Sequence, residues 1–255
     1  MATMKYILTF LLLYSYVSAE NATIKSIFDK YALDGTFVVT SLEDNSSYIY
    51  NTPRANKRYP TASTFKIPHT LIALEEGVVA STNDVIKWDG IQREYPLWNQ
   101  DQTLRSALQY SCVWCYKEFT KHIPQERYQN YLEAFEYGNK IIGADKSSFW
   151  LNGSLQITAM EQIMFLRKLY NNALPISLKS MQIVKEIMHV EDEHYFELYA
   201  KSGFSGLIGW YVGYIRVQKG VYFFALNADV KKEQLPLRKQ IVLESLQALG
   251  IIEQF

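Results

Sequence analysis

An excess of charge of either sign is what this sequence most plainly lacks. Its 255 residues carry 26 lysine and arginine side chains against 26 aspartate and glutamate side chains, so the formal net charge is +0. A neutral chain has no overall electric field to attract nucleic acid or anionic lipid. We therefore expect neither as a partner, and any charge-guided binding must come from a local pocket.

Long apolar runs, repeats and linkers are also scarce. The one long apolar run, residues 6–17, follows Lys5 and precedes the small residues Ser18 and Ala19. It is shorter than the roughly 20 residues that span a bilayer. This pattern predicts a signal peptide over residues 1–19 and an exported protein with no membrane segment after cleavage. Without repeats, low-complexity stretches or a Pro/Gly-rich linker, residues 20–255 are expected to form a single domain.

Cysteine and histidine are too few and too scattered to suggest a metal site. Cys112 and Cys115 are the two cysteines, and the four histidines have no ligand spacing around them. A redox role for C-x-x-C would need a thioredoxin-like βαβ context, which the pattern lacks. In an exported protein the pair is either a structural disulfide or two buried thiols. The sequence leaves these two alternatives open.

Strand patterns occupy both ends of the chain, and helical patterns lie between them. Runs of β-branched and aromatic residues predict strands over 35–42, 46–50, 195–200, 209–217 and 221–227. Helical periodicity predicts helices over 24–32, 63–76, 159–170, 177–188 and 237–249. Thr158 and Glu161 form a capping box for the third of these. The order predicts an α+β fold, with an antiparallel sheet built from both chain termini, flanked by helices, and an inserted helical lobe. The acidic stretch 191–194 is expected to be a solvated turn.

The sharpest chemical signal is the segment Ser63-Thr64-Phe65-Lys66. In a helix, Ser63 and Lys66 lie one turn apart on the same face. The free N–H groups of a first turn favour negative charge that develops beside Ser63. A serine hydroxyl is a poor nucleophile without a base, and a lysine becomes a base when burial lowers its pKa. The neighbours Phe65 and Ile67 are apolar. We therefore expect Ser63 as nucleophile and Lys66 as its base, in preference to a helix cap followed by a solvated lysine.

Two further short motifs fit the same chemistry. Ser111 and Val113 fall in an interruption between helical stretches, where a second hydroxyl can pass a proton to a leaving amine. Lys201-Ser202-Gly203 lies at the end of an expected strand, where the lysine can hold a carboxylate and the glycine lets a substrate backbone approach closely. Each motif is weak alone, and their order and spacing together give them weight.

In this order, S-x-x-K, a serine triplet and a K-[ST]-G motif are typical of penicillin-binding proteins and serine β-lactamases. The triplet Ser-Cys-Val, followed by Tyr137-Gly138-Asn139 and Trp150, closely resembles that of the class D β-lactamases, the oxacillinases. Further residues that match the family lie in segments 60–67, 88–90, 98–99, 149–151, 209–213 and 235–239. The resemblance covers nearly the whole mature chain. It implies a β-lactamase/transpeptidase-like fold, a periplasmic location and hydrolysis of penicillin-type antibiotics that confers resistance.

The resemblance implies a modified lysine at the centre of the site. In the family, the motif lysine, here Lys66, reacts with carbon dioxide to give an N-carboxylate, so bicarbonate is needed but no metal or other cofactor. This N6-carboxylysine would take the proton of Ser63 for acylation and activate water for deacylation. The Trp150 indole, which can only donate a hydrogen bond, would hold it. Four side chains would form the apolar wall: Phe65, Val113, Trp150 and Leu151.

The resemblance also assigns the remaining site residues. The backbone N–H groups of Ser63 and Phe204 would form the oxyanion hole. Lys201 and Arg238 would hold the β-lactam carboxylate, and Ser111 would pass a proton to the ring nitrogen. The expected substrate-binding residues are Val113, Trp150, Leu151, Ser202, Gly203, Phe204 and Arg238.

Two alternatives would acylate without rapid turnover. A β-lactam-sensing receptor domain commonly has asparagine where this chain has Val113, and it follows several transmembrane helices. A D,D-peptidase lacks a route to fast deacylation, and the context of Trp150 argues against it. Departures from the family are Ser202 in place of threonine, Trp114 in place of proline, and a short connection over 204–208. The preferred antibiotic and the choice between monomer and homodimer therefore stay open.

Overall fold

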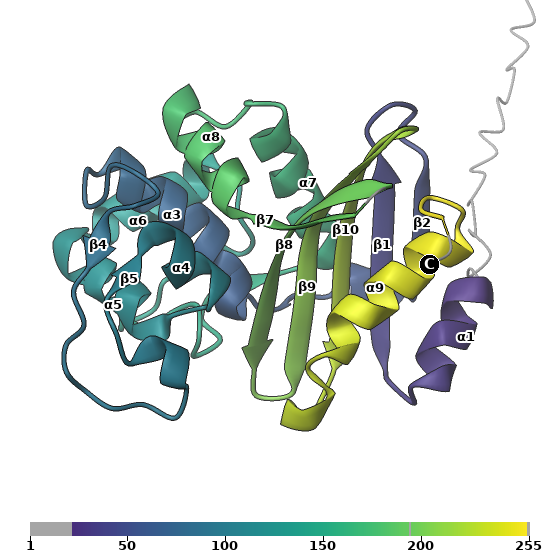
Figure 1. Cartoon of the computed structure of the whole chain (residues 1–255), viewed down its shortest axis with the longest axis horizontal. Coiled ribbons are helices and arrows are strands. Elements are labelled where there is room, and N and C mark those ends of the chain that lie inside the picture. The colour runs from purple at the N-terminus through teal and green to yellow at the C-terminus, as the bar shows by residue number, and fades with distance from the viewer. Residues whose placement is uncertain (1–21, 194, 254–255) are drawn as a thin grey trace, which may run out of the picture.

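The computed structural model describes residues 22–193 and 195–253, and six of the described strands form one antiparallel sheet built from both ends of the chain (Figure 1). They are β1 (Gly35–Ser41), β2 (Ser47–Tyr50), β7 (His189–Glu193), β8 (Phe196–Ser205), β9 (Ile208–Val217) and β10 (Gly220–Asp229). The order across the sheet is β2-β1-β10-β9-β8-β7. The predicted sheet from both termini is confirmed. The predicted signal peptide, residues 1–19, lies outside the described residues.

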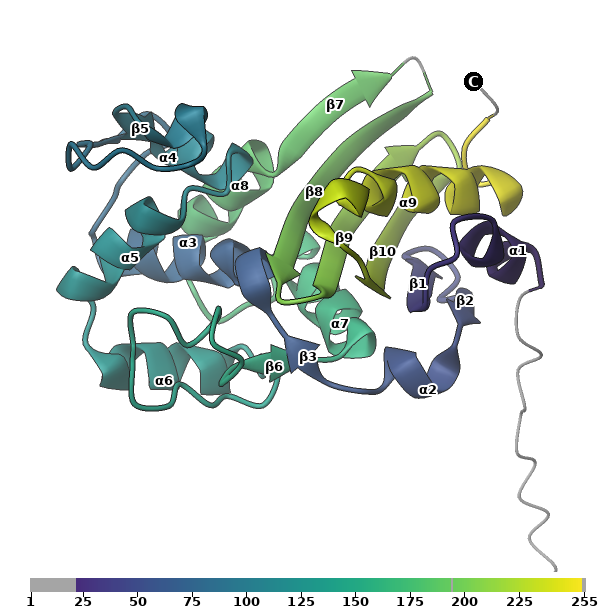
Figure 2. The same cartoon turned by 90° about the horizontal axis from the view of Figure 1, so that it is seen from below.

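Helices from the two ends of the chain cover one face of this sheet. Helix α1 (Ala22–Lys30) packs beside α9 (Leu237–Ala248), as both views show (Figures 1 and 2). Phe28 from α1 and Leu246 from α9 belong to the same buried apolar cluster as Phe224 of β10. Burial of each such side chain stabilises the fold by roughly 1.5–3 kcal/mol relative to leaving it exposed. Packing on this face therefore holds the N-terminal and C-terminal helices together.

The opposite face carries the helices that lead to the site. Helix α7 (Ala159–Tyr170) packs on β1 and β10, and it begins at the predicted capping box of Thr158 and Glu161. The other helices on this side are α3 (Lys66–Glu75), α4 (Leu104–Gln109), α5 (Val113–His122), α6 (Gln125–Ala134) and α8 (Leu178–Ile187). A second apolar cluster joins this helical lobe to the sheet through Trp210 and Phe223.

Short elements complete the fold. They are the helices α2 (Thr52–Ala55), η1 (Ala62–Phe65), η2 (Pro96–Trp98) and η3 (Lys232–Gln234), the pair β3 (Tyr59–Pro60) with β6 (Gln156–Ile157), and the pair β4 (Val85–Ile86) with β5 (Gln102–Thr103). Within 22–193 and 195–253, no helix is both long and apolar enough to cross a membrane.

Two local expectations were wrong. The acidic stretch expected as a turn is strand β7 as far as Glu193, with residue 194 outside the described part of the chain. Because β7 is an edge strand paired only with β8, its charged side chains stay in solvent without breaking the sheet. The Lys201-Ser202-Gly203 motif lies inside β8, not at its end, since pairing with β9 continues to Ser205.

Candidate active site

The structure brings Ser63 and Lys66 together at the junction of two helices. Ser63 lies in the 3-10 helix η1, and Lys66 is the first residue of α3, which continues the same path. Lys66 Nζ donates a hydrogen bond to Ser63 Oγ at 2.9 Å. Ala62, just before the serine, has a left-handed backbone with φ of 48°, a conformation that costs energy in a residue other than glycine and clusters at functional sites.

The surroundings of Lys66 favour a neutral amine. Its side chain is 0% exposed, and this burial lowers the pKa of the amine to about 7. The Nζ lies 5.1 Å from the centroid of the Tyr116 ring. A buried amine that is uncharged near neutral pH can accept a proton from its hydrogen-bonded serine.

Trp150 belongs to the aromatic cluster formed with Phe65 and His69, the neighbours of Lys66 in the chain and on α3, and it has an unused donor. Its ring is wholly buried and stacks on Phe65, with centroids 5.9 Å apart. The indole Nε1 is buried and has no hydrogen-bond partner among the residues that the structure describes. A buried donor without a partner is costly, so this N–H is suited to an acceptor brought to the site.

Sequence reasoning missed the aromatic enclosure that holds this pair in place. His69 is wholly buried, its Nε2 is 2.6 Å from the hydroxyl of Tyr128, and its ring packs edge-on against Trp150 at 5.1 Å. Burial and the charge of Lys66 lower the pKa of His69 well below its usual value. The spacing of three from Lys66 was the available signal, because it places both side chains on one face of α3.

Lys201 and Ser111 form the second polar pair of the site. Lys201 Nζ donates hydrogen bonds to Ser111 Oγ and, at 2.8 Å, to the carbonyl oxygen of Ser202. Burial, together with the charges of Lys66 and Arg238, lowers the pKa of Lys201 well below its usual value. Ser111 has a left-handed backbone with φ of 54°, so the turn between α4 and α5 presents its hydroxyl to β8.

A disulfide between Cys112 and Cys115 follows Ser111 directly and resolves the open alternative in favour of a bridge. Cys112 is also the N-cap of α5, and its N–H bonds the carbonyl of Ala107 at 2.9 Å. Trp114, the residue that replaces the family proline, donates its indole N–H to the carbonyl of Trp98 at 2.9 Å. The Ser111 turn is therefore held from both sides.

Gly203 lets strand β8 approach the nucleophile. A Cβ at this position would lie 3.1 Å from Thr64 Cγ2 and 3.3 Å from Trp210 Cβ, so a side chain would push β8 away from η1. Arg238 donates to the carbonyl oxygen of Gly203 at 2.6 Å, and partial burial lowers the pKa of the guanidinium to about 10. The absence of a side chain at Gly203 thus lets β8 pack closely against η1. The sequence suggested a different use for it, the close approach of a substrate backbone.

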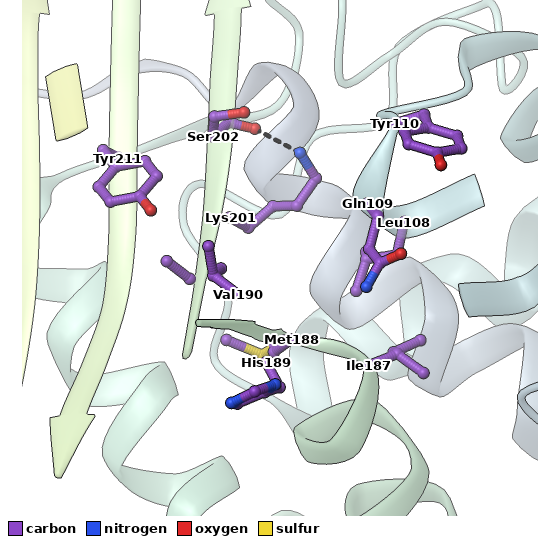
Figure 3. A pocket seen from close by; sticks show the side chains of 11 residues that line it. Leu108, Gln109, Tyr110, Ile187, Met188, His189, Val190, Lys201, Ser202 and Tyr211 are labelled. Carbon is purple, nitrogen blue, oxygen red and sulfur yellow. Dashed lines mark hydrogen bonds between the residues drawn. The ribbon is translucent and has the colours of Figure 1, made fainter. Parts of the chain in front are cut away.

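These residues surround a cleft of about 290 Å³. Predicted residues that line it are Ser63, Ser111, Val113, Leu151, Ser202, Gly203, Phe204 and Arg238. Residues that sequence reasoning had not given a role are Tyr95, Trp98, Tyr110 and Leu235. Lys201 lines a second hollow of about 310 Å³ instead of this cleft, together with Met188, His189 and Tyr211 (Figure 3), and Ser202 lines both.

Basic side chains at the site lack acidic partners. Among the described residues, no carboxylate forms an ion pair with Lys66, Lys201 or Arg238. Arg238 lines the cleft and Lys201 lies next to it in β8, so an anionic ligand is favoured at this place and would itself favour the protonated form of Lys201. Within 22–193 and 195–253, no three His, Cys, Asp or Glu side chains gather closely enough to hold a metal ion.

Comparison with known proteins gives consistent matches over almost the whole chain. Residues 28–247 match the family model described as the penicillin binding protein transpeptidase domain. The chain is 41% identical over 237 residues to β-lactamase OXA-3 of Pseudomonas aeruginosa, covering 90% of this chain and 86% of that protein. It is 41% identical over 238 residues to β-lactamase OXA-48 of Klebsiella pneumoniae, covering 91% and 90%.

A solved structure shows the same agreement in three dimensions. The class D β-lactamase FUS-1 (OXA-85) of Fusobacterium nucleatum subsp. polymorphum superposes with a TM-score of 0.89 at 38% identity, covering 92% of this chain and 100% of that one. The antiparallel sheet flanked by helices is thus the architecture of that enzyme as well.

Proposed function

The chain belongs to the class D β-lactamases and hydrolyses β-lactam antibiotics, and on this premise we propose that Ser63 is the nucleophile and Lys66 the base that activates it. The observation that carries this assignment is the 2.9 Å hydrogen bond between Ser63 Oγ and a wholly buried lysine whose pKa is lowered to about 7. The serine is within reach of the cleft, because it is 8% exposed and lines the wall.

Substrate capture depends on the cations that have no acidic partner. The carboxylate of a β-lactam enters beside Lys201 and Arg238, and its negative charge favours the protonated form of Lys201. Val113 and Leu151 line the same cleft and provide apolar contact for the bicyclic ring. Ser202 keeps the hydroxyl that threonine supplies in relatives, so it can donate to the same carboxylate.

Acylation moves two protons through named atoms. Ser63 Oγ attacks the lactam carbonyl carbon as its proton passes to the base at Lys66, while the N–H groups of Ser63 and Phe204 stabilise the oxygen that becomes negative. Ser111 Oγ then gives a proton to the ring nitrogen as the C–N bond breaks, and Lys201 Nζ, hydrogen-bonded to it, replaces that proton. The proton held by the base then returns through solvent to Lys201. In deacylation the base takes a proton from water as the hydroxide attacks the ester carbonyl, and it passes this proton to Ser63 Oγ as the ester C–O bond breaks, so the free enzyme is restored.

Lys66 and Trp150 fit a carboxylated lysine. A neutral, desolvated amine is the form that combines with carbon dioxide, and the unpaired Trp150 Nε1 is a donor for the oxygen this would bring. When bound, the group supplies a basic oxygen suited to accept protons from Ser63 and from water. The residues present support this modification, with Phe65 and Trp150 keeping water from the amine.

We further propose that residues 1–19 are removed as a signal peptide and that the mature chain is a single domain in the periplasm. The Cys112–Cys115 disulfide supports export, because such bonds persist in oxidising compartments.

The decisive experiment is hydrolysis of a chromogenic cephalosporin with and without added bicarbonate, paired with mass spectrometry after incubation with a penicillin. Wild type should turn over many times, with bicarbonate relieving loss of activity during turnover. Ser63→Ala should show no covalent adduct and no turnover, and Lys66→Ala should accumulate the adduct because water has no base. An adduct on Ser63→Ala would show that the nucleophile is another residue.

A further inference from the structure

We propose that Glu94 and Lys232 form a bridge across the mouth of the cleft and that this bridge makes the enzyme discriminate against penicillins with a large acylamino side chain. The inference rests on the proposed function and adds a specificity determinant to it. Glu94 and Lys232 are ion-paired although they belong to segments far apart in the sequence. Lys232 Nζ also lies over the ring of Tyr95, 5.7 Å from its centroid.

The two segments are opposite rims of one cleft. Tyr95 and Trp98 line it from the loop that carries η2, and Leu235 and Arg238 line it from the segment that follows η3. Lys232 stands in η3 and reaches the Tyr95 ring with its ammonium group. A side chain that starts on one rim and ends on the other must pass over the opening between them.

Hydrogen bonds and a ring contact hold the loop rim in its conformation. Trp98 donates its indole N–H to the carbonyl of Tyr110 at 2.9 Å, and the rings of Tyr95 and Trp98 pack at 4.7 Å. Asn99 closes the loop by accepting from Arg93 N at 2.8 Å and donating to Arg93 O at 3.0 Å.

The rim that carries Lys232 is also anchored. Lys231 N donates to Gln234 Oε1 at 2.9 Å within the segment, and Arg238 Nη1 ties the segment to β8 by donating to the carbonyl of Gly203 at 2.6 Å. With both backbones held, the mouth opens through rotation of the Lys232 side chain. Exposed side chains rotate in picoseconds to nanoseconds, far faster than turnover.

The orientation of the substrate decides which part meets the bridge. Lys201 and Arg238 hold the carboxylate on the β8 side of the cleft. The acylamino side chain at the other end of the nucleus then points toward the aromatic rim of Tyr95 and Trp98. A small side chain passes beneath Lys232, whereas a large one has to displace it and break the pair with Glu94.

The size of the effect follows from the exposure of the pair. The side chains of Lys232 and Glu94 are 58% and 71% exposed, and an exposed pair of this kind shifts an equilibrium by at most about fivefold. Loss of the contact with the Tyr95 ring adds a factor of about two to five. The bridge therefore changes the relative kcat/KM of penicillins with large and small side chains by roughly one order of magnitude, and it does not exclude either from the site. Because the rotation is a rapid equilibrium, the effect belongs to KM more than to kcat.

The test compares benzylpenicillin with piperacillin, which share a nucleus and a single negative charge and differ in the size of the acylamino side chain. The quantity measured is the ratio of kcat/KM for piperacillin to that for benzylpenicillin, so a general change in attraction for anions cancels. The variants are Glu94→Gln, Lys232→Gln and the charge swap Glu94→Lys with Lys232→Glu. Lys87→Gln is the matched control, because Lys87 forms a similar exposed pair with Asp101 at 2.7 Å on the same loop.

Glu94→Gln should raise the ratio by up to about fivefold and Lys232→Gln by about tenfold, because the second variant also loses the contact with Tyr95, in each case through a lower KM for piperacillin. The charge swap should bring it back toward the wild-type value, and Lys87→Gln should leave it unchanged. Added salt should raise the ratio in wild type and less so in Lys232→Gln, because screening weakens the pair. An unchanged ratio in both single variants, or an equal rise for both penicillins, overturns the bridge while leaving the proposed function intact. No turnover of benzylpenicillin by wild type would instead reject the proposed function itself.

Discussion

Lys66 Nζ lies 2.9 Å from Ser63 Oγ, and the lysine side chain that makes this contact is wholly removed from solvent. A buried ammonium has lost its hydration without gaining an ionic partner, so the neutral amine is favoured and the pKa falls to about 7. The same burial that prepares the base should therefore reduce the stability of the fold.

The first prediction concerns the pH dependence of that cost. Because the pKa of Lys66 is lower in the folded state than its usual 10.5, the unfolded chain binds more protons between about pH 7 and 10.5, and stability rises with pH across this window. The full shift corresponds to a cost on the order of 5 kcal/mol, present below about pH 7. In buffer freed of carbon dioxide, where Lys66 is a free amine, Lys66→Met should gain more stability over wild type at about pH 6 than at about pH 9, as urea unfolding would measure. An equal gain at both pH values would contradict the lowered pKa.

The second prediction concerns Lys201 and Arg238. Replacing either with alanine should weaken substrate capture, since a hydrogen bond between charged groups contributes on the order of 1.5–3 kcal/mol. Lys201→Ala should reduce kcat as well, because its Nζ also bonds Ser111 Oγ. Steady-state kinetics with benzylpenicillin separates the two effects. Equal and negligible changes would mean that the carboxylate is held elsewhere.

The third prediction concerns Trp150. Trp150→Phe keeps an aromatic ring beside Phe65 but removes the unpaired indole N–H. Activity should become strongly dependent on bicarbonate and should fall further as the pH drops, because protonated Lys66 does not combine with carbon dioxide. A carbon-13 NMR spectrum with labelled bicarbonate should show a carbamate signal in wild type that weakens in the variant. If the melting temperature falls but the bicarbonate dependence is unchanged, Trp150 is only a core aromatic.

The fourth prediction concerns the disulfide. A bridge that closes a loop as short as Cys112–Cys115 contributes about 2 kcal/mol in the chain-entropy description. Replacing both cysteines with serine should lower the free energy of unfolding by about this amount. It should also lower kcat, because the Ser111 turn loses its covalent support. A reductant acting on wild type should reproduce both losses, and it should leave the double variant unaffected.

The sequence predicted the parts of this molecule that local patterns encode. The antiparallel sheet and the capping box of Thr158 lie where expected, and Ser63, Ser111 and Lys201 come together, although the Lys201 motif lies within β8 and not at its end. Strand β7 was missed because an edge strand with three acidic residues in succession has the composition of a turn. Its pairing with β8, and not its own composition, makes it a strand.

The contacts around the site were less predictable. His69 and Tyr128 come from different helices, and nothing local in either segment indicates that they meet at 2.6 Å. The same is true of Glu94 and Lys232, which meet only because the fold sets two rims against each other. Such contacts depend on tertiary packing, whereas the motif residues are recognised by spacing along the chain.

The sheet that joins both ends of the chain has a consequence for how the protein is made. Strand β1 has β10 as its central partner, with Gly35 opposite Ala228 and Ser41 opposite Tyr222. Strand pairings between residues so far apart in the sequence form slowly. The chain must lose the entropy of closing a large loop before the stabilising contacts between the strands can form. The middle of the sheet cannot assemble until strand β10, which ends at Asp229, has been synthesised. Because β8 reaches the site only as part of this sheet, the wall that carries Lys201 and Gly203 is completed last, after the helices that carry Ser63 and Lys66.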